Sequence, residues 1–440
     1  MDQASELEDS AAAQFDTRRR QGATCPASAI GATFNPFASP FLDDPYSFLE
    51  RAQREEPVFY SPEIDHWVVT RFEDVRTVFS NPDVWSAANA LSAVTPLSPR
   101  VMQRLRESQF RMNPVLTNLD PPAHMRIRKH ATNAFSTRHV AAAEPWIREL
   151  ADRAIDRLIA KTQEADGLRR ADMVSEFAYE LPALVAFRFL GVPNSRVEDV
   201  KAWTQNRVML TWGRCDEQTQ WDEAEGLIAM WKFCERHIAD TMARDEDSFL
   251  GALVHYHREN PGDLSVNEME SILFTMLVAG HETTSNAMAN TCATLLGERE
   301  HWERLVAEPG LIPQAVEEML RHRPSIISWR RVAARDTELQ GRPIAKGDRI
   351  LLMIAAANHD PTQFPNPETV DLCRANARRH LTFGHGVHLC IGAGLARLQM
   401  KVFLEQLVAR LPGLELDAGQ RYEYVPNLSF RGPTRVAVHW

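Results

Sequence analysis

A cysteine in a glycine-rich loop is the residue of this sequence best placed to do chemistry. Cys390 stands near the end of Phe383-Gly384-His385-Gly386-Val387-His388-Leu389-Cys390-Ile391-Gly392. Glycine permits backbone conformations and close approaches that a Cβ would block, so Gly384 and Gly386 let the loop wrap one sulfur and a flat ligand, and Gly392 relieves crowding behind it. We therefore expect Cys390 to be presented to a ligand. For Cys215, Cys234, Cys292 and Cys373 we expect the ordinary state of a free cysteine, which is buried and structural.

The residues after this loop predict how the thiol is activated. Ala393 to Leu404 has the apolar spacing of a helix. A thiolate at the start of a helix is stabilised by the helix dipole and by free backbone N–H groups, which lower its pKa. As an axial ligand of haem iron, a thiolate donates electron density that favours O–O bond cleavage, whereas histidine favours reversible oxygen binding or peroxidase chemistry. The loop thus predicts oxygen activation.

A second segment combines an apolar helix with a polar interruption. Ile272 to Val278 is apolar, and Ala279-Gly280-His281-Glu282-Thr283-Thr284 follows, while Ser265 and Glu268 form a capping box upstream. Ala279 and Gly280 leave room for a ligand, and a threonine hydroxyl that bonds back one turn opens a helix. Glu282 could then exchange protons with solvent and Thr283 donate one. Taken alone, the segment equally fits a kinked helix with a solvated glutamate.

The two segments together resemble cytochromes P-450. The loop matches the haem-binding signature of that family at its defining positions, and the second segment resembles the distal-helix motif A-G-x-[DE]-T-[TS]. The resemblance implies haem b (iron protoporphyrin IX) with Cys390 as the axial iron ligand, Thr283 and Glu282 as an alcohol–acid pair that handles protons, and further cofactor contacts from Phe383, Gly384, Gly386, Gly392, Ala279 and Gly280.

Two further motifs imply supporting roles. Glu318 and Arg321 resemble the E-x-x-R pair of the family, completed by Arg374 from a later loop. This network would hold the haem loop, although such a pair alone is usually a surface feature.

The haem propionates would need cationic or hydrogen-bonding partners. The segment from His124 to Arg128 resembles the family's H-x-x-x-R motif, and Arg331 and His388 complete the set. Arg330 remains an alternative to Arg331, since both could point inward.

The elements that must position these residues predict a mainly α fold, the triangular helical body of the family with small β-sheets. Residues 58–60 and 67–70 read as a hairpin, residues 122–320 as successive helices, and 350–354 and 435–438 as strands. We expect residues 1–33 to be a flexible N-terminal tail and residues 34–440 a single haem-thiolate monooxygenase domain.

Composition limits the partners and the compartment. A formal charge of −10 and a pI near 5.9 disfavour nucleic acid or an anionic membrane as the main partner. The start of the chain lacks the apolar stretch of a signal peptide, and the run 272–280 is too short to span a bilayer. The cysteines form no C-x-x-C pair, which favours a reducing, cytoplasmic location.

The resemblance implies a monooxygenase that hydroxylates, dealkylates or epoxidises a small hydrophobic organic substrate with O2. Electrons would come from a fused or separate flavin/iron–sulfur reductase or from a ferredoxin, because the chain has no four-cysteine cluster site and no flavin domain. More weakly, residues 35–60 look similar to haem domains of the self-sufficient type, fused to a module like phthalate dioxygenase reductase. A basic face formed by Arg126, Lys129, Arg378, Arg379 and Arg397 could receive an acidic redox partner.

Two other functions remain open. A peroxide-driven peroxygenase would use the same haem without electrons, and the Glu282-Thr283 pair weighs against it. A haem-based gas or redox sensor would need only Cys390 and a closed pocket.

Overall fold

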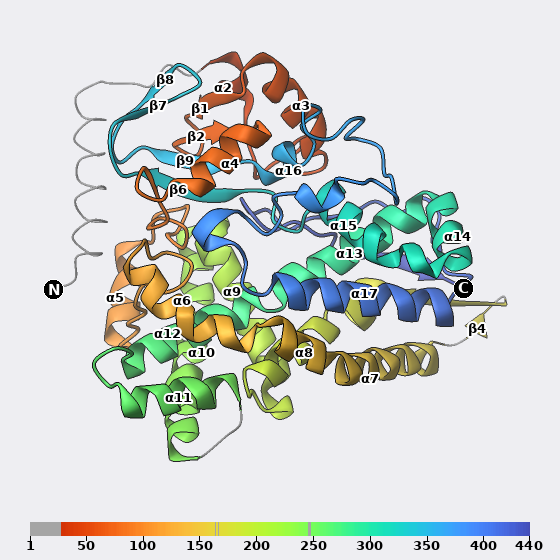
Figure 1. Cartoon of the computed structure of the whole chain (residues 1–440). Helices are drawn as coiled ribbons and strands as arrows, with labels where there is room; N and C mark the ends of the chain where they lie inside the picture. The colour runs from red at the N-terminus through yellow and green to blue at the C-terminus, as the bar shows by residue number, and fades with distance from the viewer. Residues whose placement is uncertain (1–27, 163, 166, 245–247) are drawn as a thin grey trace.

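The computed structural model describes residues 28–440 except 163, 166 and 245–247. The strands within residues 58–69 and 329–352 gather at the top of Figure 1, and β4 (Glu164–Ala165) lies apart from them near the C-terminus, while helices make up most of the remainder. The helices are α2 (Ala29–Thr33), α3 (Pro45–Glu55), α4 (Phe72–Ser80), α5 (Pro99–Glu107), α6 (Ala123–Ala134), α7 (Thr137–Lys161), α8 (Leu181–Phe189), α9 (Val197–Trp212), α10 (Glu217–Ala243), α11 (Phe249–Glu259), α12 (Val266–Ala279), α13 (Glu282–Gly297), α14 (Arg299–Ala307), α15 (Ile312–His322), α16 (Ile354–Ala357) and α17 (Ala393–Arg410).

Short helical turns connect these helices: η1 (Val174–Ala178), η2 (Asn194–Arg196), η3 (Pro309–Leu311), η4 (Ala377–Arg379) and η5 (Gly386–His388). Within the described ranges, no helix is long and apolar enough to cross a membrane.

The largest sheet carries the expected hairpin. β1 (Val58–Ser61) pairs antiparallel with β2 (His66–Val69), and the sheet continues through β9 (Arg349–Leu352), β6 (Trp329–Ala333) and β3 (Trp85–Ser86). β-Branched and aromatic residues favour these strands because their side chains pack on the pleated surface. β6 lies between β9 and β3, which fixes the direction of Arg330 and Arg331.

A second sheet joins two distant parts of the chain, in the order β10 (Glu415–Leu416), β11 (Ala437–His439), β5 (Leu168–Asp172) and β4 (Glu164–Ala165). A third sheet is the hairpin of β7 (Thr337–Leu339) and β8 (Arg342–Ile344). The predicted strand 435–438 is thus displaced toward the C-terminus, and β4 and β5 interrupt the run predicted to be helical.

Two predicted boundaries were wrong. The strand expected at 350–354 ends at Leu352, and Ile354–Ala357 forms α16, because a run of alanines favours a helical turn once the ladder stops. The flexible tail expected at residues 1–33 was also given too late an end, because residues 29–33 form helix α2. α2 is capped by the Ser28 side chain, which accepts a hydrogen bond from Gly31 N, and Ile30 is buried. Residues 1–27 lie outside the described residues.

Two apolar clusters make up the core. One joins the large sheet with α9, α10, α11 and α12, and the other joins α7, α13, α15 and α17. α12 belongs to the first cluster and α13 to the second, so the break between these helices lies where the two clusters adjoin. α17 runs beside α7 and contacts α13 and α15 (Figure 1). The glycine-rich loop therefore enters its helix next to the break in the α12–α13 pair.

Candidate active site

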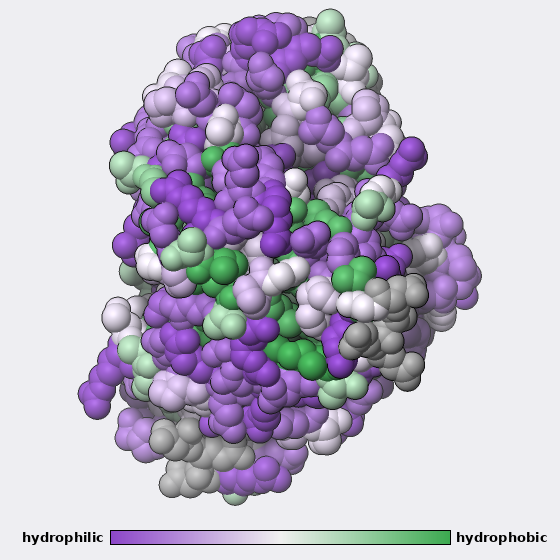
Figure 2. Space-filling model, turned by 90° about the vertical axis from the view of Figure 1, so that its right-hand side faces the viewer, coloured by the Kyte–Doolittle hydropathy of each residue, from purple (hydrophilic) through white to green (hydrophobic). Residues whose placement is uncertain are grey.

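A cavity of about 290 Å³ lies between the glycine-rich loop and the broken helix. Its walls are mostly apolar and come from segments far apart in the sequence. Figure 2 shows hydrophobic surface gathered near the middle of a face that is otherwise largely hydrophilic. The lining away from the glycine-rich loop includes Leu91, Val115, Leu116, Arg207, Trp212, Val278, Ala279, Ile326 and Phe430.

The glycine-rich loop holds Cys390 against this cavity. The Cys390 amide donates to Phe383 O at 2.8 Å, and η5 forms the turn in front of the cysteine. Gly384 and Gly386 have φ values of 72° and 70°, in the left-handed region that glycine favours. A Cβ on Gly386 would lie 2.8 Å from Phe79 O, so the loop needs glycine there both for its conformation and for its contact with α4.

The crowding expected at Gly392 is absent. A Cβ there would lie 3.9 Å from Cys390 Sγ, an ordinary van der Waals contact. Gly392 instead precedes the first turn of α17 as its cap residue.

Protein surroundings act on the Cys390 thiol in opposing directions. Burial raises the pKa of Cys390 above its usual value and outweighs the hydrogen bonds from the backbone of Gly392 and Ala393 and the charges of Arg128 and Arg397, which lower it. The expected net lowering of this pKa was therefore wrong, although the two hydrogen bonds do come from the start of α17. Cys390 is therefore presented to the cavity with donors aimed at its sulfur.

The other cysteines in the described chain, unlike Cys390, do not line the cavity. Cys215, Cys234 and Cys292 are buried, as expected. Cys373 is exposed, which contradicts the expectation, and it accepts a hydrogen bond from Arg304 at 3.2 Å.

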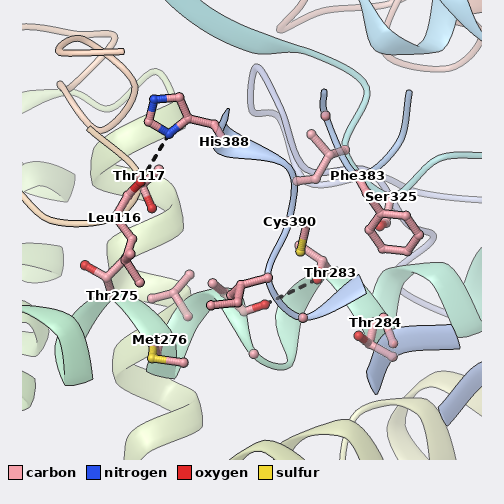
Figure 3. Close-up of a pocket in the computed structure, with 18 of the residues that line it drawn as sticks. Leu116, Thr117, Thr275, Met276, Thr283, Thr284, Ser325, Phe383, His388 and Cys390 are labelled. Carbon is pink, nitrogen blue, oxygen red and sulfur yellow. Dashed lines mark hydrogen bonds between the residues drawn. The ribbon is translucent and has the colours of Figure 1, made fainter. Parts of the chain in front are cut away.

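The opposite wall is the break between α12 and α13. The capping box of Ser265 and Glu268 starts α12 as predicted, and α12 ends at Ala279. Thr283 Oγ1 donates to Ala279 O at 3.4 Å, the expected bond to the previous turn. Figure 3 shows this bond and Cys390 of the loop. The break thus brings a hydroxyl and a thiol to one cavity.

His281 supports the break from behind. It is 1% exposed, and its Nδ1 lies 2.7 Å from Leu277 O, so the ring can donate to a carbonyl that the broken helix leaves free. His281 Nε2 lies 3.2 Å from Glu282 Oε1.

Glu282 was expected to exchange protons with solvent, but its carboxylate points toward Thr204 and His281. Its carboxylate does not line the cavity and is not an open solvent contact, because it accepts from Thr204 Oγ1 at 3.1 Å and pairs with His281. Burial would raise the pKa of Glu282, but the charge and hydrogen bond of His281, the Thr204 hydroxyl and the Lys201 charge together lower it. Glu282 therefore belongs to a polar cluster behind the helix break.

A set of donors forms one side of the cavity. Arg128, Arg331 and His388 line it, and the His388 ring lies 4.2 Å from the ring of His124. Arg128 donates to Leu389 O and Arg331 to Arg330 O, but no carboxylate in the described chain pairs with either arginine. His388 Nε2 and both ring nitrogens of His124 are buried without a partner.

Such buried, unpaired donors are costly unless a ligand satisfies them. Two guanidinium groups and two imidazoles could bind the two carboxylates of a flat cofactor. The Cys390 thiol beside them could ligate the metal of that cofactor. The donor set therefore fits haem.

The structure separates Arg330 from Arg331. Arg330 donates to Ser92 O at 2.6 Å and to Ala90 O at 3.0 Å, so it anchors the loop over the cavity. Arg331 alone of the two lines the cavity.

The predicted supporting network is present. Glu318 and Arg321 are fully buried, with the carboxylate and guanidinium in two contacts of 2.7 and 2.8 Å. Arg374 Nε lies 3.1 Å from both Glu318 oxygens, and its other nitrogens donate to Pro365 O, Asn366 O and Thr369 O. The network thus fastens α15 to the segment that leads into the glycine-rich loop.

The cavity collects most of the predicted site residues. Those that line it are Cys390, Thr283, Phe383, Gly384, Gly392, Ala279, Gly280, Arg128, Arg331 and His388. Glu282, His124 and Gly386 lie behind the lining. Sequence reasoning missed Thr204, His281 and Arg207, of which only Arg207, a charge directly before the apolar residues 208–210, left a signal in the sequence.

Comparison with known proteins agrees with this arrangement. Residues 86–415 match the family model "Cytochrome P450". The monooxygenase PikC of Streptomyces venezuelae is 32% identical over 430 residues, covering 96% of this chain and 97% of PikC. The chain resembles cytochrome P450 CREJ, solved in complex with (4-ethylphenyl) dihydrogen phosphate, with a TM-score of 0.89 at 36% identity, covering 93% of this chain and all of that one.

A solved intact type IV self-sufficient cytochrome P450 monooxygenase is also similar, with a TM-score of 0.89 and 38% identity. The match covers 94% of this chain but 54% of that protein. By its sequence match, its fold and its relatives, this chain belongs to the cytochrome P450 family and is a P450 monooxygenase with haem as its cofactor.

Proposed function

We propose that the enzyme inserts one atom of O2 into a hydrophobic organic substrate, by hydroxylation, dealkylation or epoxidation, with electrons from a reductase. The observation that carries this proposal is the meeting of Cys390 and Thr283 at one apolar cavity. A presented thiol supports haem ligation, and an alcohol beside it supports proton delivery.

Each residue has a separate role in this proposal. Cys390 would ligate the iron, and Arg128, Arg331, His124 and His388 would hold the two propionates. Once bound, haem supplies the redox chemistry of dioxygen reduction. The Thr283 hydroxyl holds a proton in the cavity.

Glu282, His281 and Thr204 form a hydrogen-bonded group through which that proton can be replaced from behind α13. The apolar walls exclude bulk water, which limits side reactions.

The electron donor is a flavin/iron–sulfur reductase, fused or separate, or a ferredoxin. The similarity to half of a self-sufficient monooxygenase supports the first of these. Most of the expected basic face is paired with carboxylates, because Arg126 pairs with Glu268, Lys129 with Asp263, and Arg397 with Glu317. The Arg378 side chain is 77% exposed and lies 3.9 Å from Glu317, and Arg379 is exposed, so these two arginines are the contacts we propose for an acidic donor.

Isotope labelling tests the reaction class. The haem-loaded protein is supplied with a surrogate ferredoxin and ferredoxin reductase, NADPH and 18O2, and a panel of aromatic compounds that includes an aryl phosphate, the ligand class of the similar CREJ structure. We expect one 18O atom in the product. Label that enters only from H2(18O2), without electron donor, would instead indicate a peroxygenase. CO binding without product from either route would indicate a sensor.

A further inference from the structure

Arg207 is a buried charge that the proposed chemistry does not use. It lies on α9, is 4% exposed and lines the cavity. Its guanidinium stacks on the Phe274 ring at 4.4 Å, and Nη1 lies 3.3 Å from Met112 Sδ. Arg207 therefore lies on the wall of the same cavity as Cys390 and Thr283.

No anionic group of the described chain neutralises Arg207. No carboxylate of the described chain pairs with Arg207. The acidic group whose charge would act on its pKa is the Cys234 thiol. Burial raises the pKa of Cys234 well above its usual value, so this thiol is neutral. Burial lowers the pKa of Arg207 only to about 10, which leaves the guanidinium charged at neutral pH. A ring face and a thioether attract the cation without cancelling its charge.

The charges on the cavity wall do not balance even with haem bound. Among the described residues that line the cavity, the permanently charged ones are Arg128, Arg207 and Arg331, and none is an aspartate or glutamate. Haem has two carboxylates, and Arg128 and Arg331 are their proposed partners. One positive charge therefore remains, and it is the one on α9.

Neutral donors accompany this charge. Thr275 Oγ1 on α12 and Trp212 Nε1 at the end of α9 are buried without a hydrogen-bond partner, and both residues line the cavity. Thr275 follows Phe274, on whose ring Arg207 rests, and Figure 3 shows it on α12 beside Met276. Buried polar groups without partners are uncommon in folded proteins and call for a ligand that satisfies them.

We infer that the enzyme takes substrates that join a hydrophobic body to an oxyanion, a carboxylate or a phosphate monoester, and that Arg207 binds the oxyanion with a hydrogen bond from Thr275. This inference rests on the proposed function and specifies its substrate class. An anion on Arg207 fixes one end of the substrate, so the apolar remainder is the part that reaches Cys390 and Thr283. Arg207 is then a specificity-determining residue.

Calorimetric binding to the haem-loaded enzyme tests the inference without turnover. The probes are 4-ethylphenyl phosphate, 4-ethylbenzoate and the uncharged 4-ethylacetophenone. We expect at least one anion to bind about tenfold or more tightly than the ketone, since a charge-assisted hydrogen bond in a buried site has that effect on Kd. The better of the two anions identifies the head group. Equal binding of all three would overturn the inference before any variant is made.

Variants of Arg207 test whether this residue causes the preference for anionic ligands. Arg207→Gln should reduce binding of the preferred anion about tenfold to a hundredfold and change the Kd of the ketone less than about threefold. Arg207→Lys should keep part of the preference. Arg214→Gln is the matched control, because Arg214 lies just after α9, pairs with Glu63 and does not line the cavity.

The CO-bound spectrum of each variant reports whether the haem site is intact. Unchanged anion preference in Arg207→Gln would reject the role of Arg207. Oxidation of neutral compounds with O2 but no anion preference would reject this inference alone, whereas anion binding without any O2-derived product would reject the proposed function alone.

Discussion

At the scale of single residues, the Thr283 hydroxyl stands between the carbonyl of Ala279 and the open cavity. Thr283→Ala removes a proton donor from the cavity while leaving its apolar walls in place. We expect product per NADPH consumed to fall about tenfold or more and hydrogen peroxide to rise, because misplaced proton delivery releases reduced oxygen before substrate is attacked. Thr283→Ser should restore most of the coupling. Unchanged coupling in Thr283→Ala would contradict the proposed role.

The loop glycine Gly386 allows a sharper test of backbone geometry. Gly386→Ala introduces a left-handed alanine whose Cβ would lie 2.8 Å from Phe79 O, so the loop must move. We expect a loss of about 1–3 kcal/mol of unfolding free energy and weaker haem retention. Gly413→Ala is the control, because nothing lies within 4 Å of its added Cβ and its φ is outside the left-handed region. Equal effects of the two substitutions would argue against a strained loop.

Most of the site residues could be predicted from the sequence, because the residues of each motif lie close together in the chain. Cys390 and its glycines lie within ten residues, so their type and spacing already describe a loop around one sulfur. The directions of Glu282 and Arg207 depend on how α9 packs beside the α12–α13 break, which is a long-range property. For that reason the sequence predicted a carboxylate beside Thr283 but not its turn toward His281 and Thr204.

At the scale of elements, the buried network of Glu318, Arg321 and Arg374 joins α15 to the chain before the loop. Glu318→Gln leaves two buried guanidinium groups without their carboxylate, which should cost about 3–5 kcal/mol in denaturant unfolding. Glu50→Gln is the control, since Glu50 and Arg54 are 80% and 63% exposed and 3.6 Å apart, and such pairs contribute less than about 1 kcal/mol. Similar losses in both variants would show that the network does not stabilise the fold.

Glu317, the neighbour of Glu318, gives the fold a pH dependence. Burial alone would raise its pKa, but hydrogen bonds from His380 and Arg397 and their charges lower it to about 2. Because the folded-state pKa lies below the usual value of 4.5, the stabilisation is present above about pH 4.5 and is lost as the pH falls toward 2.

The Glu317→Gln variant tests this dependence. We expect it to be less stable than wild type at pH 6 and to lose less stability between pH 5 and pH 3, measured as the free energy of unfolding in urea. Parallel curves for the two proteins would refute the coupling.

Element types were largely predictable, and their ends were not. The hairpin of β1 and β2, the capped start of α12 and the helix after Cys390 follow from local periodicity and capping. The ends of β9 and β11 depend on which partner strand continues, as when β11 pairs with β5 from a distant part of the chain. β4 and β5 were missed for the same reason, because their pairing is set by tertiary contacts.

At the scale of the whole molecule, the two apolar clusters adjoin where α12 gives way to α13, and the cavity lies beside that junction. The fold therefore leaves a cavity between an ordered loop on one side and a helix break on the other, which would hold one flat cofactor. Among the described lining residues Arg207 comes from α9, so under the inference above the residues that would bind the cofactor and the residue that would select the substrate come from different elements of one cavity.

The most direct test of the account is the absorption spectrum of the dithionite-reduced, haem-loaded protein under carbon monoxide, compared between wild type, Cys390→Ala and Cys373→Ala. Cys373 is the matched control because it is an exposed cysteine that does not line the cavity. We predict the long-wavelength Soret band of a thiolate–haem carbonyl in wild type and Cys373→Ala and its loss in Cys390→Ala. The same band in Cys390→Ala, or no haem bound by wild type, would contradict the account.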